Sequence, residues 1–174
     1  DISPQLPPAM AGQLRLAEAQ GALPDRALWD RALLARLRTM EEPDFAALPD
    51  ISEGLENRLY RASRTAKSPE ELLSDAKTKR YSHARLRRVL LAAMLGLPAG
   101  LSAAAPPYLR VLGFTPRGAE ILSDAKATRT LSLSPSLAEL AQTGKTAARF
   151  AGLEARAADL YHAFTPGLAP CGSE

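Results

Sequence analysis

The sequence has little of what disulfide-bonded, metal-binding or membrane-spanning proteins need. Its 174 residues include one cysteine, Cys171, so an internal disulfide is excluded. The two histidines, His83 and His162, show no metal-ligand spacing. No apolar run approaches the roughly 20 residues of a membrane helix, and no signal peptide is visible. These absences predict a soluble, cytoplasmic protein without a metal centre.

Aromatic residues are also scarce, at 5% of the chain, whereas alanine and leucine are abundant. Strands favour β-branched and aromatic side chains, so this composition favours packed helices over a β-sandwich. A hydrophobic content of 46% is ordinary for a globular protein, and a buried core is therefore expected. We predict a mainly α fold, α+β at most.

Apolar periodicity and capping signals predict a series of helices. They cover residues 10–20, 25–40, 50–66, a segment that starts at Ser68, 82–97, 116–128 and 145–164. In the third of these helices, Asp50 and Glu53 have the spacing of a capping box. Residues 108–113 are the best strand candidate, and residues 130–133 are expected to pair with them in a short two-strand sheet.

The net charge is only +3, but the positive charge is concentrated in one segment. Residues 58–88, the basic segment, carry 10 basic side chains against 3 acidic ones. Residues 1–57 carry 5 against 10, and residues 89–174 carry 7 against 6. A solvated charged face usually mixes both signs, so this regional excess favours a polyanionic partner.

Four cations of this segment precede the helix that Ser82 is expected to cap, or lie in its first turn. Cations there oppose the helix dipole, whereas a bound phosphate would be attracted by both the helix N–H groups and the cations. Tyr81 adds a ring on which a base could stack. Single-stranded or looped RNA is favoured over duplex DNA, because no helix-turn-helix is visible. The predicted RNA-binding residues are Arg58, Arg61, Arg64, Lys77, Lys79, Arg80, Tyr81, Arg85, Arg87 and Arg88.

No arrangement of residues indicates an active site. Neither histidine lies near a serine or cysteine in a catalytic pattern. The run Thr143-Gly-Lys-Thr146 imitates the end of a phosphate loop, but Glu139 stands where the first glycine belongs, so this run predicts a helix start. Glu154 falls near the apolar stripe of the last helix, where we expect it to pair with an arginine. The residues themselves indicate a binding surface without catalytic residues.

Four blocks of the sequence keep a common order over residues 51–161. They are residues 51–58, residues 77–81 with 85–88, residues 108–114 and residues 153–161. In this order they resemble the C-terminal half of the bacterial tRNA(Met) cytidine acetate ligase family, which was earlier labelled a nucleotidyltransferase family of the HIGH-motif type.

The resemblance implies an enzyme that activates acetate with ATP and transfers the acetyl group to the amine of the wobble cytidine in elongator tRNA(Met). The ATP-binding α/β domain of that family carries a His-x-Gly-His-type motif, which this sequence lacks. Residues 1–50 match the family less distinctly, so the resemblance implies a helical connecting segment there and a helical C-terminal tRNA-binding domain over residues 51–174. No cofactor is expected in this chain, which we expect to be inactive alone. ATP with Mg, acetate and tRNA belong to the full-length enzyme.

Two other interpretations stay open. In the first, the chain is part of a nucleotidyltransferase that acts on a small phosphorylated metabolite, and the basic segment holds the phosphates of that metabolite. In the second, the chain is a helical docking module whose basic face binds an acidic protein partner, or the acidic residues 1–57 of the same chain. Binding of RNA distinguishes both of these interpretations from the tRNA-binding hypothesis.

Overall fold

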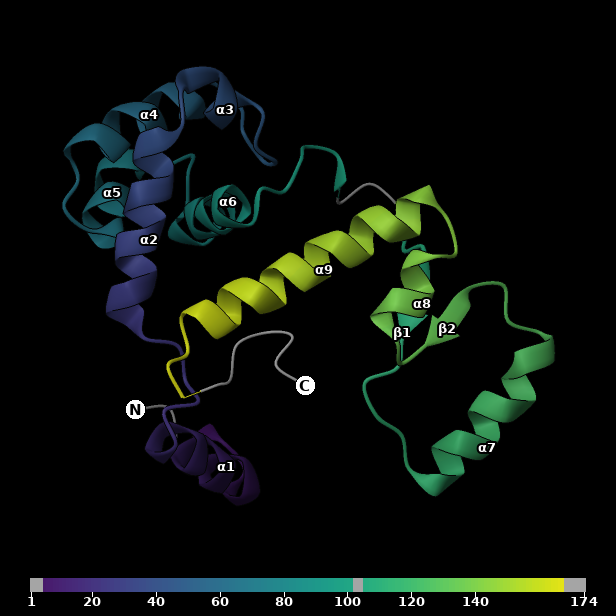
Figure 1. Ribbon diagram of the computed structural model, residues 1–174. Helices are drawn as coiled ribbons and strands as arrows, with labels where there is room; N and C mark the ends of the chain where they lie inside the picture. The colour runs from purple at the N-terminus through teal and green to yellow at the C-terminus, as the bar shows by residue number, and fades with distance from the viewer. Residues whose placement is uncertain (1–4, 102–104, 168–174) are drawn as a thin grey trace. The chain divides into compact units, whose positions relative to one another are not determined.

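The computed structural model describes residues 5–101 and 105–167, and most of these residues are helical (Figure 1). Contacts divide the chain into two compact units. The first unit comprises residues 1–101 and 157–174, and the second comprises residues 102–156. The prediction of a mainly α fold with a small sheet is therefore confirmed.

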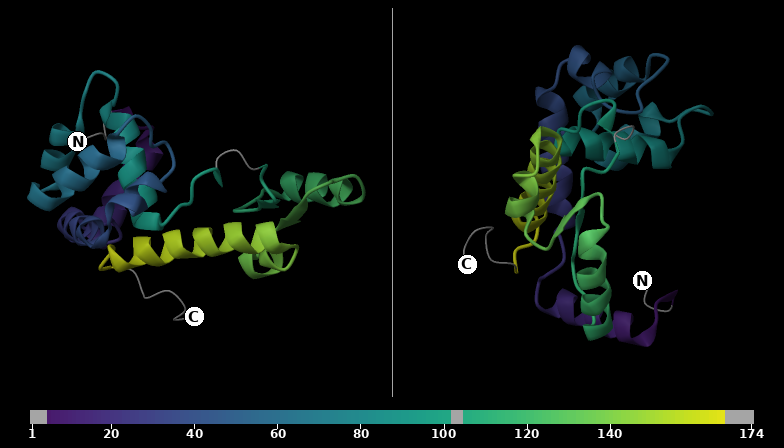
Figure 2. Two further views of the ribbon diagram at one scale, coloured as in Figure 1. Left: turned by 90° about the horizontal axis from the view of Figure 1, so that it is seen from above. Right: turned by 90° about the vertical axis from the view of Figure 1, so that its right-hand side faces the viewer.

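The first unit is a helical bundle. Its helices are α1 (Pro8–Ala19), α2 (Arg26–Thr39), α3 (Glu42–Ala46), α4 (Leu55–Thr65), α5 (Pro69–Ala76) and α6 (His83–Leu95). Figure 1 and Figure 2 show α2 to α6 gathered together, and buried side chains from each of these helices belong to one hydrophobic core. That core includes Leu33 and Leu37 from α2, Phe45 from α3, and Leu55 and Leu59 from α4. Residues before and after position 50 thus share one core. The boundaries between the two compact units lie instead after residue 101 and after residue 156.

Side-chain caps start three of these helices where the sequence predicts them. The carboxylate of Asp25 accepts from the amides of residues 27 and 28, before α2. The Ser68 hydroxyl accepts from the Glu71 amide at α5, and the Ser82 hydroxyl accepts from the Arg85 amide at α6. Each cap satisfies N–H groups that have no partner inside the helix.

The predicted capping box before α4 is wrong. Asp50 and Glu53 have positive φ angles of 63° and 56°, and Gly54, the residue before α4, has a φ of 80°. Residues in the left-handed region cannot belong to a right-handed helix, so α4 begins only at Leu55. The short helix α3, which contains Pro43, lies outside the predicted helices. Pro43 lies in its first turn, where proline is tolerated.

The second unit contains the sheet. Strand β1 (Tyr108–Arg110) pairs in parallel with β2 (Ser132–Ser134), and Leu109 lies opposite Leu133. Helix α7 (Pro116–Asp124) and a 3₁₀ turn (Ala125–Ala127) connect the two strands, as a parallel pair requires. The predicted pairing is confirmed, although both strands are shorter than expected.

Two helices follow β2, of which the first, α8 (Leu137–Ala141), was not predicted. The long helix α9 (Lys145–Ala163) matches the expected 145–164 closely, and it begins at the Thr143–Thr146 run as predicted. From residue 157 onward it belongs to the first unit. None of the helices in residues 5–101 and 105–167 is long and apolar enough to cross a membrane.

Candidate nucleic-acid interface

The basic segment covers most of α4, all of α5, the loop of residues 77–82 and the start of α6. Its cations fall into three groups according to what they contact. The first group donates hydrogen bonds to the backbone, the second forms exposed ion pairs, and the third has no partner among the described residues.

Arg58 and Arg64 cap the C-termini of neighbouring helices. The Arg58 guanidinium donates to the carbonyls of Asp75, at 3.1 Å, and Ala76, at 3.4 Å, where α5 ends. Arg64 donates to the carbonyls of residues 38 and 40 at the end of α2, and lies 4.5 Å from the centre of the Tyr60 ring. The last carbonyls of a helix have no intrahelical partner and carry partial negative charge. Both arginines therefore stabilise the fold.

Arg85 holds the left-handed loop before α4. Its Nη2 donates to the Asp50 carbonyl at 2.9 Å and to the Ser52 hydroxyl at 2.8 Å, and its Nε lies 3.3 Å from the Asp50 carboxylate. Only 23% of its side chain is exposed. These contacts explain how Asp50 is kept at a positive φ.

Arg80 and Arg88 form ion pairs at the surface. Arg80 lies 2.8 Å from the Glu53 carboxylate and Arg88 lies 3.2 Å from that of Asp50. Their side chains are 75% and 67% exposed. Exposed pairs of this kind contribute about 0–1 kcal/mol, so a phosphate can replace either carboxylate at little cost.

Four predicted cations are exposed and have no ion pair or hydrogen bond from their charged groups within residues 5–101 and 105–167. They are Arg61, Lys77, Lys79 and Arg87. Lys67, which was not among the predicted residues, is also exposed, and its ammonium group has no partner among the same residues.

Three of these free cations belong to one region of the first unit. Arg58, one turn before Arg61 on α4, contacts the two carbonyls that precede Lys77. Glu53, the partner of Arg80, lies just before α4. The loop of residues 77–82 therefore lies beside the first half of α4. We call Arg61, Lys77, Lys79 and Arg80 the basic cluster.

Arg87 lies apart from the basic cluster. On α6, Arg85 faces the loop before α4, whereas Arg87 lines a cleft formed with α2 and α5. The ten predicted residues thus do not form a single face.

The predicted role of Tyr81 as a stacking surface needs correction. Its side chain is only 4% exposed, so its ring cannot receive a base. The hydroxyl donates toward the carbonyls of Ser52, at 3.2 Å, and Glu53, at 3.0 Å. The ring is buried in the core beneath Arg85, whose guanidinium carbon lies 5.3 Å from its centre. Tyr81 anchors the loop before α4.

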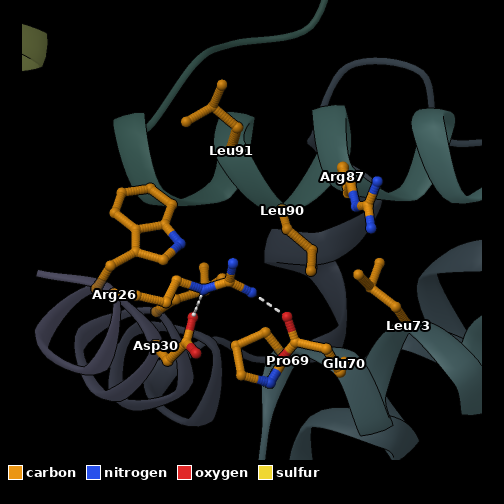
Figure 3. A pocket seen from close by; sticks show the side chains of 10 residues that line it. Arg26, Asp30, Pro69, Glu70, Leu73, Arg87, Leu90 and Leu91 are labelled. Carbon is orange, nitrogen blue, oxygen red and sulfur yellow. Dashed lines mark hydrogen bonds and ion pairs between the residues drawn. The ribbon is translucent and has the colours of Figure 1, made fainter. Parts of the chain in front are cut away.

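A cleft of about 250 Å³ between α2, α5 and α6 was not predicted (Figure 3). Leu33, Leu73 and Leu90 are among its lining residues. Arg26 forms ion pairs with Asp30 of α2 and Glu70 of α5, shown dashed in Figure 3. The hydrogen bond and charge of Asp30, followed by the charge of Glu70, raise the pKa of Arg26. The sequence carries no sign of this cleft, because its lining comes from three separated segments.

The predicted pairing of Glu154 with an arginine is confirmed. Its carboxylate accepts from Arg110, and also from the Tyr108 hydroxyl at 3.0 Å. Burial and then this hydrogen bond raise the pKa of Tyr108. The second unit therefore uses Glu154 to tie α9 to β1. His83 Nδ1 is buried without a hydrogen-bond partner in the described chain, and no group of three or more potential metal ligands occurs there.

A model of the HIGH Nucleotidyl Transferase family matches residues 1–171, and the chain belongs to this family. Among curated proteins it is similar to the tRNA(Met) cytidine acetate ligase of Clostridium kluyveri, with 42% identity over 88 residues, 48% of this chain and 22% of that protein. The enzyme of the same name from Syntrophomonas wolfei is 30% identical over 149 residues, 80% of this chain and 36% of that protein.

Two crystal structures of Thermotoga maritima TmcAL share the fold. One, with bound alpha-thio ATP, has a TM-score of 0.83 at 24% identity and covers 92% of this chain and 42% of that one. The other, the apo form I, has a TM-score of 0.70 at 25% identity and covers 79% of this chain and 36% of that one. The chain thus spans less than half the length of these relatives.

Proposed function

We propose that this chain is the tRNA-binding C-terminal part of a tRNA(Met) cytidine acetate ligase. In the full-length enzyme, ATP and acetate would supply the acetyl group that forms N-acetylcytidine at the wobble position of elongator tRNA(Met). The names of the relatives from Clostridium kluyveri and Syntrophomonas wolfei support the enzyme class. The described residues contain no catalytic arrangement, so we assign substrate binding to this chain and the chemistry to the part of the enzyme outside it.

The basic cluster is the observation that carries the binding role. Arg61, Lys77 and Lys79 are exposed cations without a partner among residues 5–101 and 105–167, and Arg80 has an exposed partner there, Glu53. Cations that do not stabilise the fold are available to neutralise phosphates, and phosphate neutralisation provides most of the affinity in nonspecific RNA binding. The backbone contacts of Arg58, Arg64 and Arg85 instead give these three a structural role.

The experiment measures binding of elongator tRNA(Met) to the 174-residue chain by fluorescence anisotropy at fixed salt. The test variant replaces Arg61, Lys77 and Lys79 together by alanine. We expect the dissociation constant to rise at least 10-fold, because three phosphate contacts are lost.

A matched control keeps the total change in charge the same. It replaces Lys126, Lys145 and Arg149, three exposed cations of the second unit without a partner in the described residues. We expect this control to bind tRNA with little loss. Equal affinity of the test variant and the unmodified chain would refute the basic cluster as the binding surface. Equal losses of tRNA affinity in the test and control variants would show that net charge, and not the position of the cations, determines binding.

A further inference from the structure

We propose that the cleft between α2, α5 and α6 holds one unstacked nucleobase of the bound RNA, a base that carries an exocyclic amino group. The inference rests on the proposed function, because the base belongs to the RNA that the basic cluster binds. The cleft has a volume of about 250 Å³. Pockets for drug-sized ligands measure roughly 300–1,000 Å³, so this cleft suits a single ring system.

The lining of the cleft favours a flat, mostly apolar ring. Leu33, Leu73 and Leu90 are 2%, 5% and 4% exposed and form its apolar floor. Trp29 is half-buried, and its indole N–H has no partner in the part of the chain that the structure describes. Leu91, also in the lining, is 46% exposed, which is high for a leucine beside a core. Unstacked RNA bases are bound by stacking on aromatic side chains.

The polar groups of the cleft match the edge of an amino-bearing base. Asp30 and Glu70 both form ion pairs with Arg26 at one wall of the cleft. A carboxylate has about four acceptor positions, so each has positions left for another donor. Acidic side chains accept hydrogen bonds from the exocyclic amine of cytosine. Uracil has no such amine and would place a carbonyl oxygen against these carboxylates.

Arg87 provides the contact for the phosphate of the same nucleotide. Figure 3 shows Arg87 and Leu90 on α6 facing Leu73 and Glu70 of α5 across the cleft. Arg87 lies four residues after His83, the first residue of α6, and is therefore about 6 Å along the helix axis from the end of the loop of residues 77–82. One RNA strand can therefore contact the loop and reach the cleft. An apolar protein side chain would use neither the carboxylates nor Arg87, so a nucleotide matches more of the lining.

Trp29 is the only tryptophan of the chain, so tryptophan fluorescence reports on its surroundings, which are the cleft and the Phe164 ring, whose centre lies 5.3 Å from that of the indole. The experiment titrates the 174-residue chain with oligocytidine, oligouridine and inorganic polyphosphate, and follows binding by a separate anisotropy signal. We expect oligocytidine to quench Trp29 strongly, oligouridine to quench it less, and polyphosphate to bind without quenching.

A substitution at the mouth of the cleft provides the second readout. Leu91→Gln changes an exposed side chain, so folding is retained. Stacking of a base on an aromatic side chain corresponds to roughly 5- to 150-fold in affinity. Because Leu91 lines the same cleft as Trp29, we expect Leu91→Gln to weaken oligocytidine binding by at least the lower end of this range. Polyphosphate affinity should not change. Leu112→Gln is the matched control, because Leu112 is an 88% exposed leucine of the second unit.

The outcomes separate this inference from the proposed function. Oligocytidine that binds without changing Trp29 fluorescence would place the RNA on the basic cluster alone and overturn the inference while leaving the proposed function. Equal quenching by oligouridine would overturn the requirement for an amino group. Absence of binding by tRNA and by both oligonucleotides would overturn the proposed function together with the inference.

Discussion

Arg38 and Arg64 each cap the helix from which the other comes. Arg38 of α2 donates to the carbonyls of Ser63, at 3.4 Å, and Ala66, at 2.9 Å, where α4 ends. Arg64 of α4 donates to the carbonyls of Arg38 and Met40, where α2 ends. The two guanidinium groups thus satisfy carbonyls at both helix ends and bind the two C-termini to each other.

This reciprocal capping predicts a loss of stability on removal of either arginine. A hydrogen bond to a charged group contributes about 1.5–3 kcal/mol when buried, and part-exposed contacts less. We expect Arg38→Ala and Arg64→Ala each to lower the free energy of unfolding by about 1–2 kcal/mol. Urea denaturation followed by circular dichroism measures this loss.

Arg61→Ala is the control for this prediction, because Arg61 lies on the same helix as Arg64 without a partner in the described chain. Surface substitutions of this kind change stability by about 0.5 kcal/mol or less. The double variant of Arg38 and Arg64 should lose less than the sum of the single losses, since the two caps join the same pair of helix ends. A stability of Arg64→Ala equal to that of Arg61→Ala would show that the cap contributes nothing.

Most of the helices followed from the sequence, apart from α3, α8 and the start of α4, whereas the roles of the arginines did not. Ser68 and Ser82 cap helices where local spacing placed them, because a cap contacts residues two or three positions away. The carbonyls that Arg64 contacts lie 24 and 26 residues earlier in the chain. Every residue has the same backbone carbonyl, so no pattern of side chains in the sequence indicates which carbonyl an arginine will contact.

The burial of Tyr81 is another property that the sequence did not indicate. Its position inside the run Lys77-Thr-Lys-Arg-Tyr81 led to the prediction of a ring on which a base could stack. The loop before α4 covers it, and the left-handed residues of that loop come from another part of the sequence. Charge patterning identified the basic segment, but only the fold separates its structural arginines from its free cations.

The basic cluster also predicts the salt dependence of RNA binding. Each neutralised phosphate contributes about 0.7–0.9 to the slope of log affinity against log salt concentration. The alanine variant of Arg61, Lys77 and Lys79 should therefore reduce this slope by about 2–3 units. Anisotropy titrations at several salt concentrations provide both slopes. An unchanged slope would mean that the three cations do not contact phosphates.

The raised pKa of Tyr108 predicts that the stability of the second unit depends on pH. Burial, and then the hydrogen bond to Glu154, raise its pKa above the ordinary value of about 10. A raised pKa in the folded state means that this contribution is fully present below the ordinary pKa. It is lost as pH rises through the folded value. Stability should therefore fall in alkaline solution, and Tyr108→Phe should remove this part of the fall.

Tyrosinate absorbance gives an independent measurement of the same group. The unmodified chain should show a late phase of tyrosinate formation from Tyr108, and Tyr108→Phe should lack that phase. Glu154→Gln removes the charge but retains the burial, so it should shift the late phase only part of the way toward the ordinary pKa. A late phase that persists in Tyr108→Phe would belong to another tyrosine.

Gly167 lies so close to the turn that follows α1 that a larger residue at position 167 would collide with the backbone of that turn. Its amide donates to the carbonyl of Gly21 at 3.0 Å, and a Cβ at position 167 would lie 2.7 Å from the Gly21 carbonyl carbon and also against the Gln20 oxygen. These are backbone atoms, which cannot rotate away. We expect Gly167→Ala to destabilise the chain by about 1–3 kcal/mol in thermal unfolding. Gly152→Ala, in α9 with open space at its Cβ, should instead stabilise it by about 0.5–1 kcal/mol. If both variants were stabilised, the contact between Gly167 and Gly21 would be absent in solution.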